Sequence, residues 1–180
     1  MKGVSKNEQT VVRFIGKTAP VVLLTISGTK KLAENLLRQT VGRTNFGLRQ
    51  SLNLGPRPSS RGHALGIGLY GDLGSGKTTF MQFFGEALGV KEKILSPTFV
   101  IEKIYKIAHP NFDHLIHIDA YRLENADEMR NLGWANIIKN PRNLIAVEWA
   151  DRIAELLPNN HICVNFSHHN EESRIITFKS

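Results

Sequence analysis

Four residues of a short glycine-rich stretch have the spacing of a phosphate-binding loop. Residues 66–80 read GIGLYGDLGSGKTTF, in which Gly71, Gly76, Lys77 and Thr78 match the pattern G-x-x-x-x-G-K-[ST]. Glycines allow the backbone to point N–H groups at phosphate oxygens, and a helix that begins here adds its positive N-terminal end. In this pattern the lysine bridges the β- and γ-phosphates and the threonine binds Mg²⁺. The stretch predicts a bound nucleotide without indicating how the nucleotide is used.

Two carboxylates follow apolar segments further along the chain, where a phosphate loop needs an acidic partner. Asp119 ends LIHID and Glu148 ends LIAVE. The carboxyl ends of strands in an α/β sheet face the ligand, and a carboxylate there can hold the metal or orient an attacking water. The two residues favour nucleotide hydrolysis but do not by themselves decide which of them contacts Mg²⁺. The chain has no guanine-reading N-K-x-D tetrapeptide, which favours ATP over GTP.

The segments that must position these residues alternate between strand and helix patterns. Apolar runs predict strands at residues 66–70, 99–107, 114–121, 143–149, 161–166 and 174–178. The spacing of apolar residues predicts helices at 29–38, 77–88 and 150–157, and a helical or turn-rich segment at 124–140. We therefore expect an α/β fold with a P-loop NTPase-like sheet, mainly parallel with antiparallel edge strands, and with helices on both faces.

The size and composition of the chain indicate one domain. Its 180 residues are 41% apolar, which suffices for one buried core and is short for two, so we expect a single domain over residues 1–180. No run approaches the roughly 18 consecutive apolar residues of a membrane span, and residues 1–14 lack the pattern of a secretory signal. We expect a cytoplasmic protein that does not contact membranes. The single cysteine, Cys163, can build neither a disulfide framework nor a metal cluster.

Positive charge is concentrated in the first third of the chain. The net charge is +7, and residues 1–63 carry +9 whereas residues 64–180 carry −2. A segment rich in Gly, Pro, Ser and Asn contains five spaced arginines, Arg38, Arg43, Arg49, Arg57 and Arg61. We predict a basic loop insertion at about residues 39–63. Its residues leave two interpretations open, an arm that contacts RNA phosphates and a solvated loop.

Four blocks of sequence occur in a specific order along the chain. They are GDLGSGKTTF at 71–80, SPTFVIEKIY at 96–105, HIDAYRL at 117–123 followed by DEMRNLG at 127–133, and VEW at 147–149. Together they resemble the TsaE (YjeE) family, bacterial P-loop ATPases of tRNA threonylcarbamoyladenosine (t6A) biosynthesis. The phosphate loop alone is generic, but SPTF, H-x-D-x-Y-R-L and Glu-Trp in this order are specific. The sequence departs from the family pattern in its arginine-rich stretch and in EWADR, where the family usually has Glu-Trp-Pro.

The resemblance implies an ATPase with ATP and Mg²⁺ as cofactors. The implied nucleotide contacts are Leu73, Gly74, Ser75, Gly76, Lys77, Thr78, Thr79, Asp119 and Glu148. Among them, Thr78 and Glu148 would hold Mg²⁺, and the implied catalytic residues are Lys77, Asp119 and Glu148. The resemblance also implies that Ser96 and Thr98 respond to the γ-phosphate and that Trp149 supports the site.

The resemblance further implies that the protein acts together with other subunits. It would bind and hydrolyse ATP in the system that places threonylcarbamoyl on the tRNA adenosine next to the anticodon. TsaB and TsaD would be its partners, and tRNA would be contacted indirectly or through the complex. Because no arginine finger is evident beyond Arg122, we expect slow hydrolysis by the protein alone.

Two other function classes use the same loop. A small-molecule kinase would be expected to cluster arginines in a lid late in the chain, but residues 153–180 contain only Arg174. An RNA-binding module with a nucleotide switch would use the arginine-rich segment. The residues favour the ATPase and keep the kinase as the main alternative.

Overall fold

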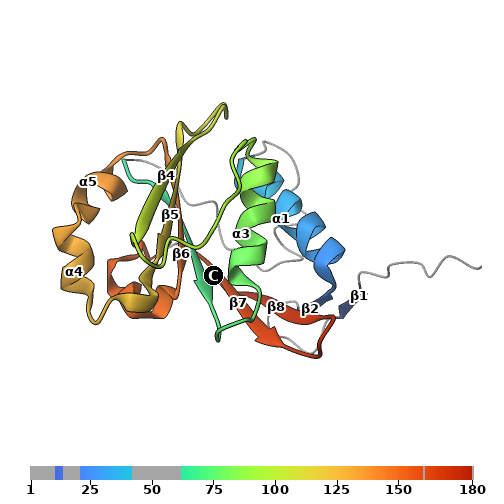
Figure 1. Ribbon diagram of the computed structural model, residues 1–180. Coiled ribbons are helices and arrows are strands. Elements are labelled where there is room, and N and C mark those ends of the chain that lie inside the picture. The colour runs from blue at the N-terminus through green and yellow to red at the C-terminus, as the bar shows by residue number, and fades with distance from the viewer. Residues whose placement is uncertain (1–10, 14–20, 42–61, 160, 180) are drawn as a thin grey trace, which may run out of the picture.

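A single mixed sheet forms the centre of the computed structural model, which describes residues 11–13, 21–41, 62–159 and 161–179 (Figure 1). Within these residues the strand order is β1-β2-β8-β7-β3-β6-β5-β4. The strands are β1 (Val11–Arg13), β2 (Val21–Leu24), β3 (Leu65–Tyr70), β4 (Glu102–Lys106), β5 (His114–Asp119), β6 (Asn143–Glu148), β7 (Ile162–His168) and β8 (Arg174–Lys179).

The four middle strands, β7, β3, β6 and β5, are parallel to one another. Parallel strands covered on both faces consist of nearly continuous apolar runs, and β3 and β6 are accordingly buried along almost their whole length. The pairs β4–β5, β7–β8, β8–β2 and β2–β1 are antiparallel. The predicted α/β sheet with a parallel centre and antiparallel edges is confirmed. One antiparallel edge is wider than predicted because β1 and β2, which the sequence did not reveal, extend it.

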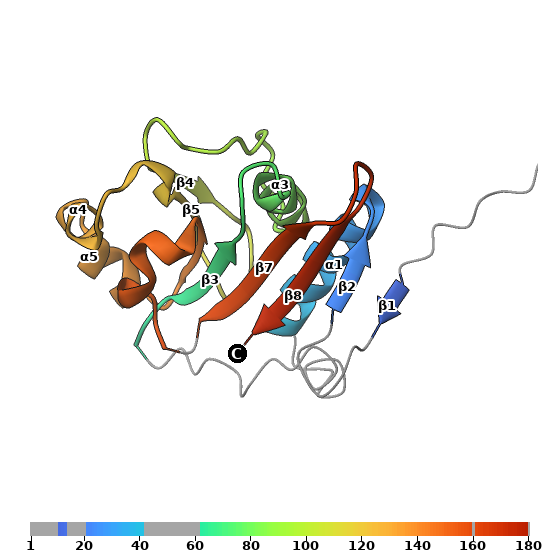
Figure 2. The same cartoon turned by 90° about the horizontal axis from the view of Figure 1, so that it is seen from below.

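Helices cover both faces of this sheet (Figures 1 and 2). The first face carries α1 (Ile26–Val41) and α3 (Lys77–Ala87), and the second carries α4 (Ala126–Asn131), α5 (Trp134–Lys139) and the 3₁₀ segments η1 (Ala120–Arg122) and η2 (Ala150–Leu156). Each layer buries its own apolar cluster against the strands, with Leu36, Phe80 and Phe84 in the first and Met129 and Trp134 in the second. Helices on both faces were predicted and are confirmed.

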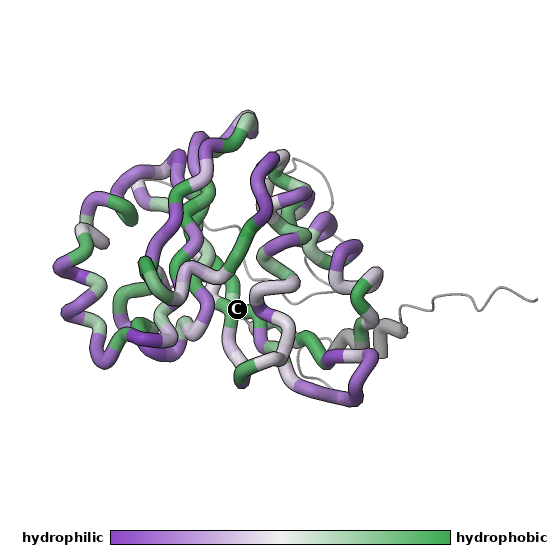
Figure 3. The backbone as a smooth tube through the Cα atoms, viewed as in Figure 1, coloured by the Kyte–Doolittle hydropathy of each residue, from purple (hydrophilic) through white to green (hydrophobic). Residues whose placement is uncertain are grey.

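The distribution of hydropathy agrees with this layered arrangement. Figure 3 shows apolar segments running through the centre of the molecule, where β3 lies, and a hydrophilic connection between β7 and β8. Burial of apolar side chains between sheet and helices is the main favourable contribution to such a fold. No helix among the described residues combines the length and the apolar character needed to cross a membrane.

Several elements differ in their bounds or type from the sequence prediction, and three of them follow. The strand predicted at 99–107 begins only at Glu102, because residues 97–101 form a turn in which the carbonyl of Pro97 accepts from the N–H groups of Val100 and Ile101. The helix predicted at 150–157 is a 3₁₀ segment with non-helical dihedrals at Ile153. The helix predicted at 29–38 extends over Ile26–Val41.

The basic insertion predicted at about residues 39–63 falls largely outside the described residues, which exclude 42–61. Its two interpretations, and with them the prediction of one domain over residues 1–180, therefore stay predictions.

Candidate nucleotide-binding site

The glycine-rich loop connects the end of β3 to the start of α3 and has the backbone geometry that its sequence predicts. Gly71, Gly74 and Gly76 have positive φ angles of 131°, 74° and 105°, a region that side chains with a Cβ rarely adopt. Gly71 also lies against β7, since a Cβ at this position would be 2.1 Å from the carbonyl oxygen of Phe166. The loop therefore needs these glycines both for its turns and for its close approach to β7.

Lys77 begins α3 and turns its side chain back over the loop. Its Nζ donates to the carbonyl oxygens of Gly71 at 2.6 Å and Asp72 at 2.8 Å, and it lies 4.1 Å from the centroid of the Trp149 ring. Burial lowers the pKa of Lys77, and the nearby carboxylate of Glu148 partly opposes this shift. The ammonium is thus held at the loop by weak acceptors that a phosphate group, a stronger acceptor for a cation, can replace.

Thr78 and Glu148 meet at the start of α3. The Thr78 hydroxyl donates to Glu148 Oε2 at 2.7 Å, and Glu148 Oε1 lies 2.9 Å from Nε2 of His117. Glu148 and His117 are both buried. The sequence placed Thr78 and Glu148 in one site, but it did not single out His117 as a partner of that carboxylate.

Asp119 lies beside Glu148, because the parallel register of β5 and β6 pairs these two residues. Its Oδ2 accepts hydrogen bonds from the hydroxyls of Ser96 and, at 2.7 Å, Thr98. Its Oδ1 accepts the backbone N–H of Tyr121 at 3.0 Å. The segment that resembles a switch is therefore fastened, through Asp119, to the strand next to the one that carries Glu148.

A pocket of about 320 Å³ brings these groups together. This volume is within the range of small-molecule sites in proteins. The pocket is lined by Leu73, Gly74, Gly76, Lys77, Thr78, Thr79, Ser96, Thr98, Asp119, Tyr121, Glu148 and Trp149. The lining includes every residue proposed from the sequence as a catalytic, nucleotide, metal or switch residue except Ser75.

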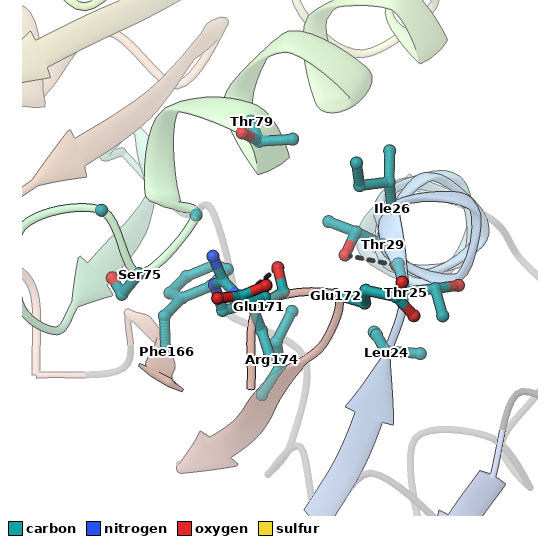
Figure 4. Close-up of a pocket in the computed structure, with 13 residues that line it drawn as sticks. Leu24, Thr25, Ile26, Thr29, Ser75, Thr79, Phe166, Glu171, Glu172 and Arg174 are labelled. Atoms are coloured by element: carbon teal, nitrogen blue, oxygen red, sulfur yellow. Dashed lines mark hydrogen bonds between the residues drawn. The ribbon is translucent and has the colours of Figure 1, made fainter. Parts of the chain in front are cut away.

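Ser75 belongs to the lining of a second hollow next to the phosphate loop (Figure 4). Its Oγ is fully buried and has no hydrogen-bond partner. The hollow measures about 170 Å³ and shares Gly74, Gly76 and Thr79 with the first pocket. Its remaining lining residues are Leu24, Thr25, Ile26, Thr29, Phe166, Glu171, Glu172, Arg174 and Ile176. These come from the β2–α1 junction and from the β7–β8 hairpin, and none of them was proposed as a site residue from the sequence.

Two aromatic residues form a wall of the first pocket. The rings of Tyr121 and Trp149 lie 5.0 Å apart between centroids, and Trp149 has a left-handed backbone with φ 57°. Tyr121 is 43% exposed, so it is not a core residue. The turn directly after Glu148 thus directs the Trp149 ring toward Lys77, and both rings belong to the site.

The oxygen atoms of this pocket suit Mg²⁺ in the presence of a nucleotide. Thr78 Oγ1 and Glu148 Oε2 are hard oxygen donors that already lie 2.7 Å apart. In the described part of the chain no three His, Cys, Asp or Glu side chains converge on one point. Mg²⁺ is commonly held by one or two protein oxygens together with substrate phosphates and water. The residues present therefore fit a metal that is bound together with nucleotide.

Arg122 does not line the described pocket. Its guanidinium carbon lies 4.4 Å from the centroid of the exposed Phe99 ring. A cation stacked on an aromatic ring is held there by the ring quadrupole. The described pocket accordingly contains Lys77 as a cationic side chain and no arginine.

Comparisons of this chain with family models and with known proteins point to the same family. A sequence model of the family described as "Threonylcarbamoyl adenosine biosynthesis protein TsaE" matches residues 25–176. The tRNA threonylcarbamoyladenosine biosynthesis protein TsaE of Bacillus subtilis is 39% identical over 110 residues, which are 61% of this chain and 66% of that protein. The protein of the same name from Rickettsia typhi is 37% identical over 112 residues, 62% of this chain and 74% of that protein.

A solved structure shares the fold. The crystal structure of YdiB from Bacillus subtilis superimposes with a TM-score of 0.54 and 24% identity, covering 91% of this chain and 87% of that one.

Proposed function

Because this chain belongs to the TsaE family of threonylcarbamoyl adenosine biosynthesis proteins, we propose that it binds and hydrolyses ATP for threonylcarbamoylation of tRNA adenosine next to the anticodon, acting with TsaB and TsaD. The observation that carries this proposal is the pocket in which Lys77, Thr78, Asp119 and Glu148 surround the phosphate loop. A cytoplasmic location follows from the role in tRNA modification.

The phosphates of ATP occupy the first pocket. Lys77 exchanges the carbonyl oxygens of Gly71 and Asp72 for the β- and γ-phosphates, and the loop N–H groups bind the remaining oxygens. Thr78 and Glu148 would hold Mg²⁺, which would neutralise phosphate charge when bound. These fixed dipoles and charges stabilise the charge that develops on the γ-phosphate during hydrolysis.

The nucleoside half of ATP enters the second hollow. The two pockets share Gly74, Gly76 and Thr79. A ligand whose phosphates lie in the first pocket can therefore extend into the second hollow. Apolar side chains such as Ile26 and Ile176 offer walls for a base, and Thr25 and Glu172 offer hydrogen-bonding groups. We assign ribose and adenine to this hollow as part of the same proposal.

Asp119 orients the attacking water. Its carboxylate lines the pocket and is held by Ser96 and Thr98. When these hydroxyls turn toward a γ-phosphate, one oxygen of Asp119 is released to accept a hydrogen bond from water. This arrangement makes the position of the switch segment depend on which nucleotide is bound.

Hydrolysis by the protein alone is slow, and partner subunits stimulate it. The lining of the first pocket includes no arginine, and Arg122 stacks on Phe99 instead. Arginine supplied to such a site accelerates hydrolysis by about 10³ to 10⁵. Neither the first pocket nor the relatives favour the alternative of a small-molecule kinase, since the first pocket offers no arginine to bind an acceptor.

Reconstitution of tRNA modification tests the proposal. The protein is combined with TsaB, TsaD, tRNA and the threonylcarbamoyl donor, and both ATP hydrolysis and t6A formation are measured over several turnovers. Lys77→Ala, Asp119→Ala and Glu148→Ala should each lower hydrolysis by about 10² or more and prevent repeated turnover. Lys91→Ala, which removes an exposed lysine, is the matched control. Unchanged multi-turnover modification in all three site variants would contradict the proposed role.

A further inference from the structure

A buried histidine lies behind the carboxylate of the candidate metal site. His117 is on β5, its side chain is completely inaccessible to solvent, and its Nε2 lies 2.9 Å from Oε1 of Glu148. Residues alternate between the two faces of a strand. Leu115 of β5 and Ala146 of β6 belong to the core on the α1/α3 side, so His117 and Glu148 also face α3 and the phosphate loop.

The two ring nitrogens of this imidazole differ in their partners. Nδ1 of His117 is buried and has no hydrogen-bond partner. A proton on Nε2 makes the ring a hydrogen-bond donor to Glu148 Oε1, because an ionised carboxylate can only accept. His117 therefore acts as a hydrogen-bond donor to the carboxylate of Glu148.

Glu148 is consequently held at both of its oxygens. Oε1 accepts from His117, and Oε2 accepts from Thr78 at 2.7 Å. The bond to Thr78 joins two atoms that would both bind Mg²⁺, so it has to be exchanged when the metal is bound. The bond to His117 uses the other oxygen and can persist throughout. It fixes the rotation of the carboxylate so that Oε2 keeps facing Thr78.

We infer that His117 is a positioning residue that orients Glu148 for Mg²⁺, an inference that rests on the proposed role of Thr78 and Glu148 as metal ligands. Groups that orient a metal ligand through a hydrogen bond typically change metal affinity by about 10- to 100-fold when removed. A purely structural His117 would affect the thermal stability of the protein but not the Mg²⁺ dependence of nucleotide binding.

Binding of ADP as a function of Mg²⁺ concentration separates these two roles. Calorimetric titrations with ADP are made for the wild type, His117→Leu, His117→Asn and His117→Gln, in EDTA and over a series of Mg²⁺ concentrations. Leucine removes the donor, asparagine is too short to bring its amide to the position of Nε2, and glutamine can place an N–H there. His117→Leu and His117→Asn should raise the half-saturating Mg²⁺ concentration by about 10- to 100-fold, with ADP binding in EDTA unchanged. His117→Gln should stay within about threefold of the wild type.

The other possible results of these titrations also test the role of His117. If His117→Leu loses ADP binding in EDTA, its fold is damaged, and the comparison of His117→Asn with His117→Gln replaces it. A Mg²⁺ midpoint for His117→Asn equal to that of His117→Gln would overturn the positioning role. A wild type whose ADP binding does not depend on Mg²⁺ would overturn the metal site itself, and is thereby distinguished from a failure of the inference about His117 alone.

Discussion

The ammonium of Lys77 lies 4.1 Å from the centroid of the Trp149 ring, although 72 positions separate the two residues in the chain. The contact depends on the left-handed backbone of Trp149, which has φ 57° and directly follows Glu148. Non-glycine residues in this region are strained and frequently mark functional sites. Here the strained turn places an indole ring against the cation that we propose binds phosphate.

Nucleotide binding should therefore change the fluorescence of Trp149. Phosphates draw Lys77 away from the carbonyls of Gly71 and Asp72, which alters the charge next to the indole. In a Trp134→Phe variant, which leaves Trp149 as the sole tryptophan, addition of ADP and Mg²⁺ should give a saturable change in emission. The same titration with Lys77→Ala added is the control. Constant emission while equilibrium dialysis shows bound ADP would refute this coupling.

Thr98→Val should lower ATP hydrolysis more than it lowers ADP affinity. Valine keeps the shape of threonine but cannot donate to Asp119 or to a γ-phosphate, and ADP has no γ-phosphate. A hydrogen bond to a charged group contributes about 1.5 to 3 kcal/mol, so hydrolysis should fall by about 10- to 100-fold. Single-turnover hydrolysis and ADP calorimetry measure the two effects. Thr177→Val, the same exchange on β8, should change neither, and equal losses of hydrolysis and ADP affinity in Thr98→Val would argue against a switch.

The grouping of the phosphate loop with Asp119 and Glu148 could be predicted because its signals are local in sequence. The spacing of Gly71, Gly76, Lys77 and Thr78 is contained in one turn between a strand and a helix. Asp119 and Glu148 could be placed because the carboxyl ends of parallel strands meet at one edge of a sheet, and the register of β5 and β6 pairs them.

The second hollow could not be predicted, because its residues approach the phosphate loop only through pairing of distant strands. Thr25 follows β2 and Glu172 precedes β8, and these two strands become neighbours by antiparallel pairing. β2 is only four residues long, which gives too little periodicity to identify it from sequence. The sequence also could not show that Ser75 does not line the first pocket, since its position depends on the positive-φ turns at Gly74 and Gly76.

Gly71→Ala should destabilise the protein more than Gly89→Ala. Both glycines have positive φ, at 131° and 81°, and this conformation alone costs an alanine about 1 to 2 kcal/mol. At Gly89 an added Cβ would have no atom within 4 Å, whereas at Gly71 it would clash with the carbonyl oxygen of Phe166. Urea unfolding should show a loss of about 1 to 2 kcal/mol for Gly89→Ala and a clearly larger one for Gly71→Ala, which should also lose ADP binding. Equal losses would mean that the loop does not pack on β7 as described.

Arg142→Gln should raise the pKa of Asp113. Two hydrogen bonds of 2.6 Å from Arg142 hold the pKa of this carboxyl below its ordinary value of 3.8. Because the folded pKa is lower than the unfolded one, the pair contributes stability that is complete above the unfolded value and lost as the pH falls through the folded value. NMR titration of the Asp113 carboxyl should show the rise. Urea unfolding of Arg142→Gln should show a lower free energy of unfolding than the wild type at neutral pH, and this difference should disappear in acid. Lys91→Gln, which also removes one positive charge, should leave the Asp113 pKa unchanged.

Phe99→Ala should weaken the proposed interaction with TsaB and TsaD while leaving nucleotide binding by the protein alone unchanged. Phe99 is 84% exposed and Val100 is 67% exposed. Both directly follow Thr98, which lines the first pocket. Large apolar side chains so exposed beside a site commonly mark a docking surface, and removing a buried aromatic anchor from an interface often costs 2 kcal/mol or more, a loss of about 30-fold in affinity. Binding to the TsaB–TsaD assembly and its stimulation of hydrolysis should both fall in Phe99→Ala.

Leu132→Ala is the control. It removes an apolar side chain that is 50% exposed and lies outside the lining of the first pocket, and it should alter neither quantity. If both variants behave like the wild type, the partner that stimulates hydrolysis docks elsewhere on the protein.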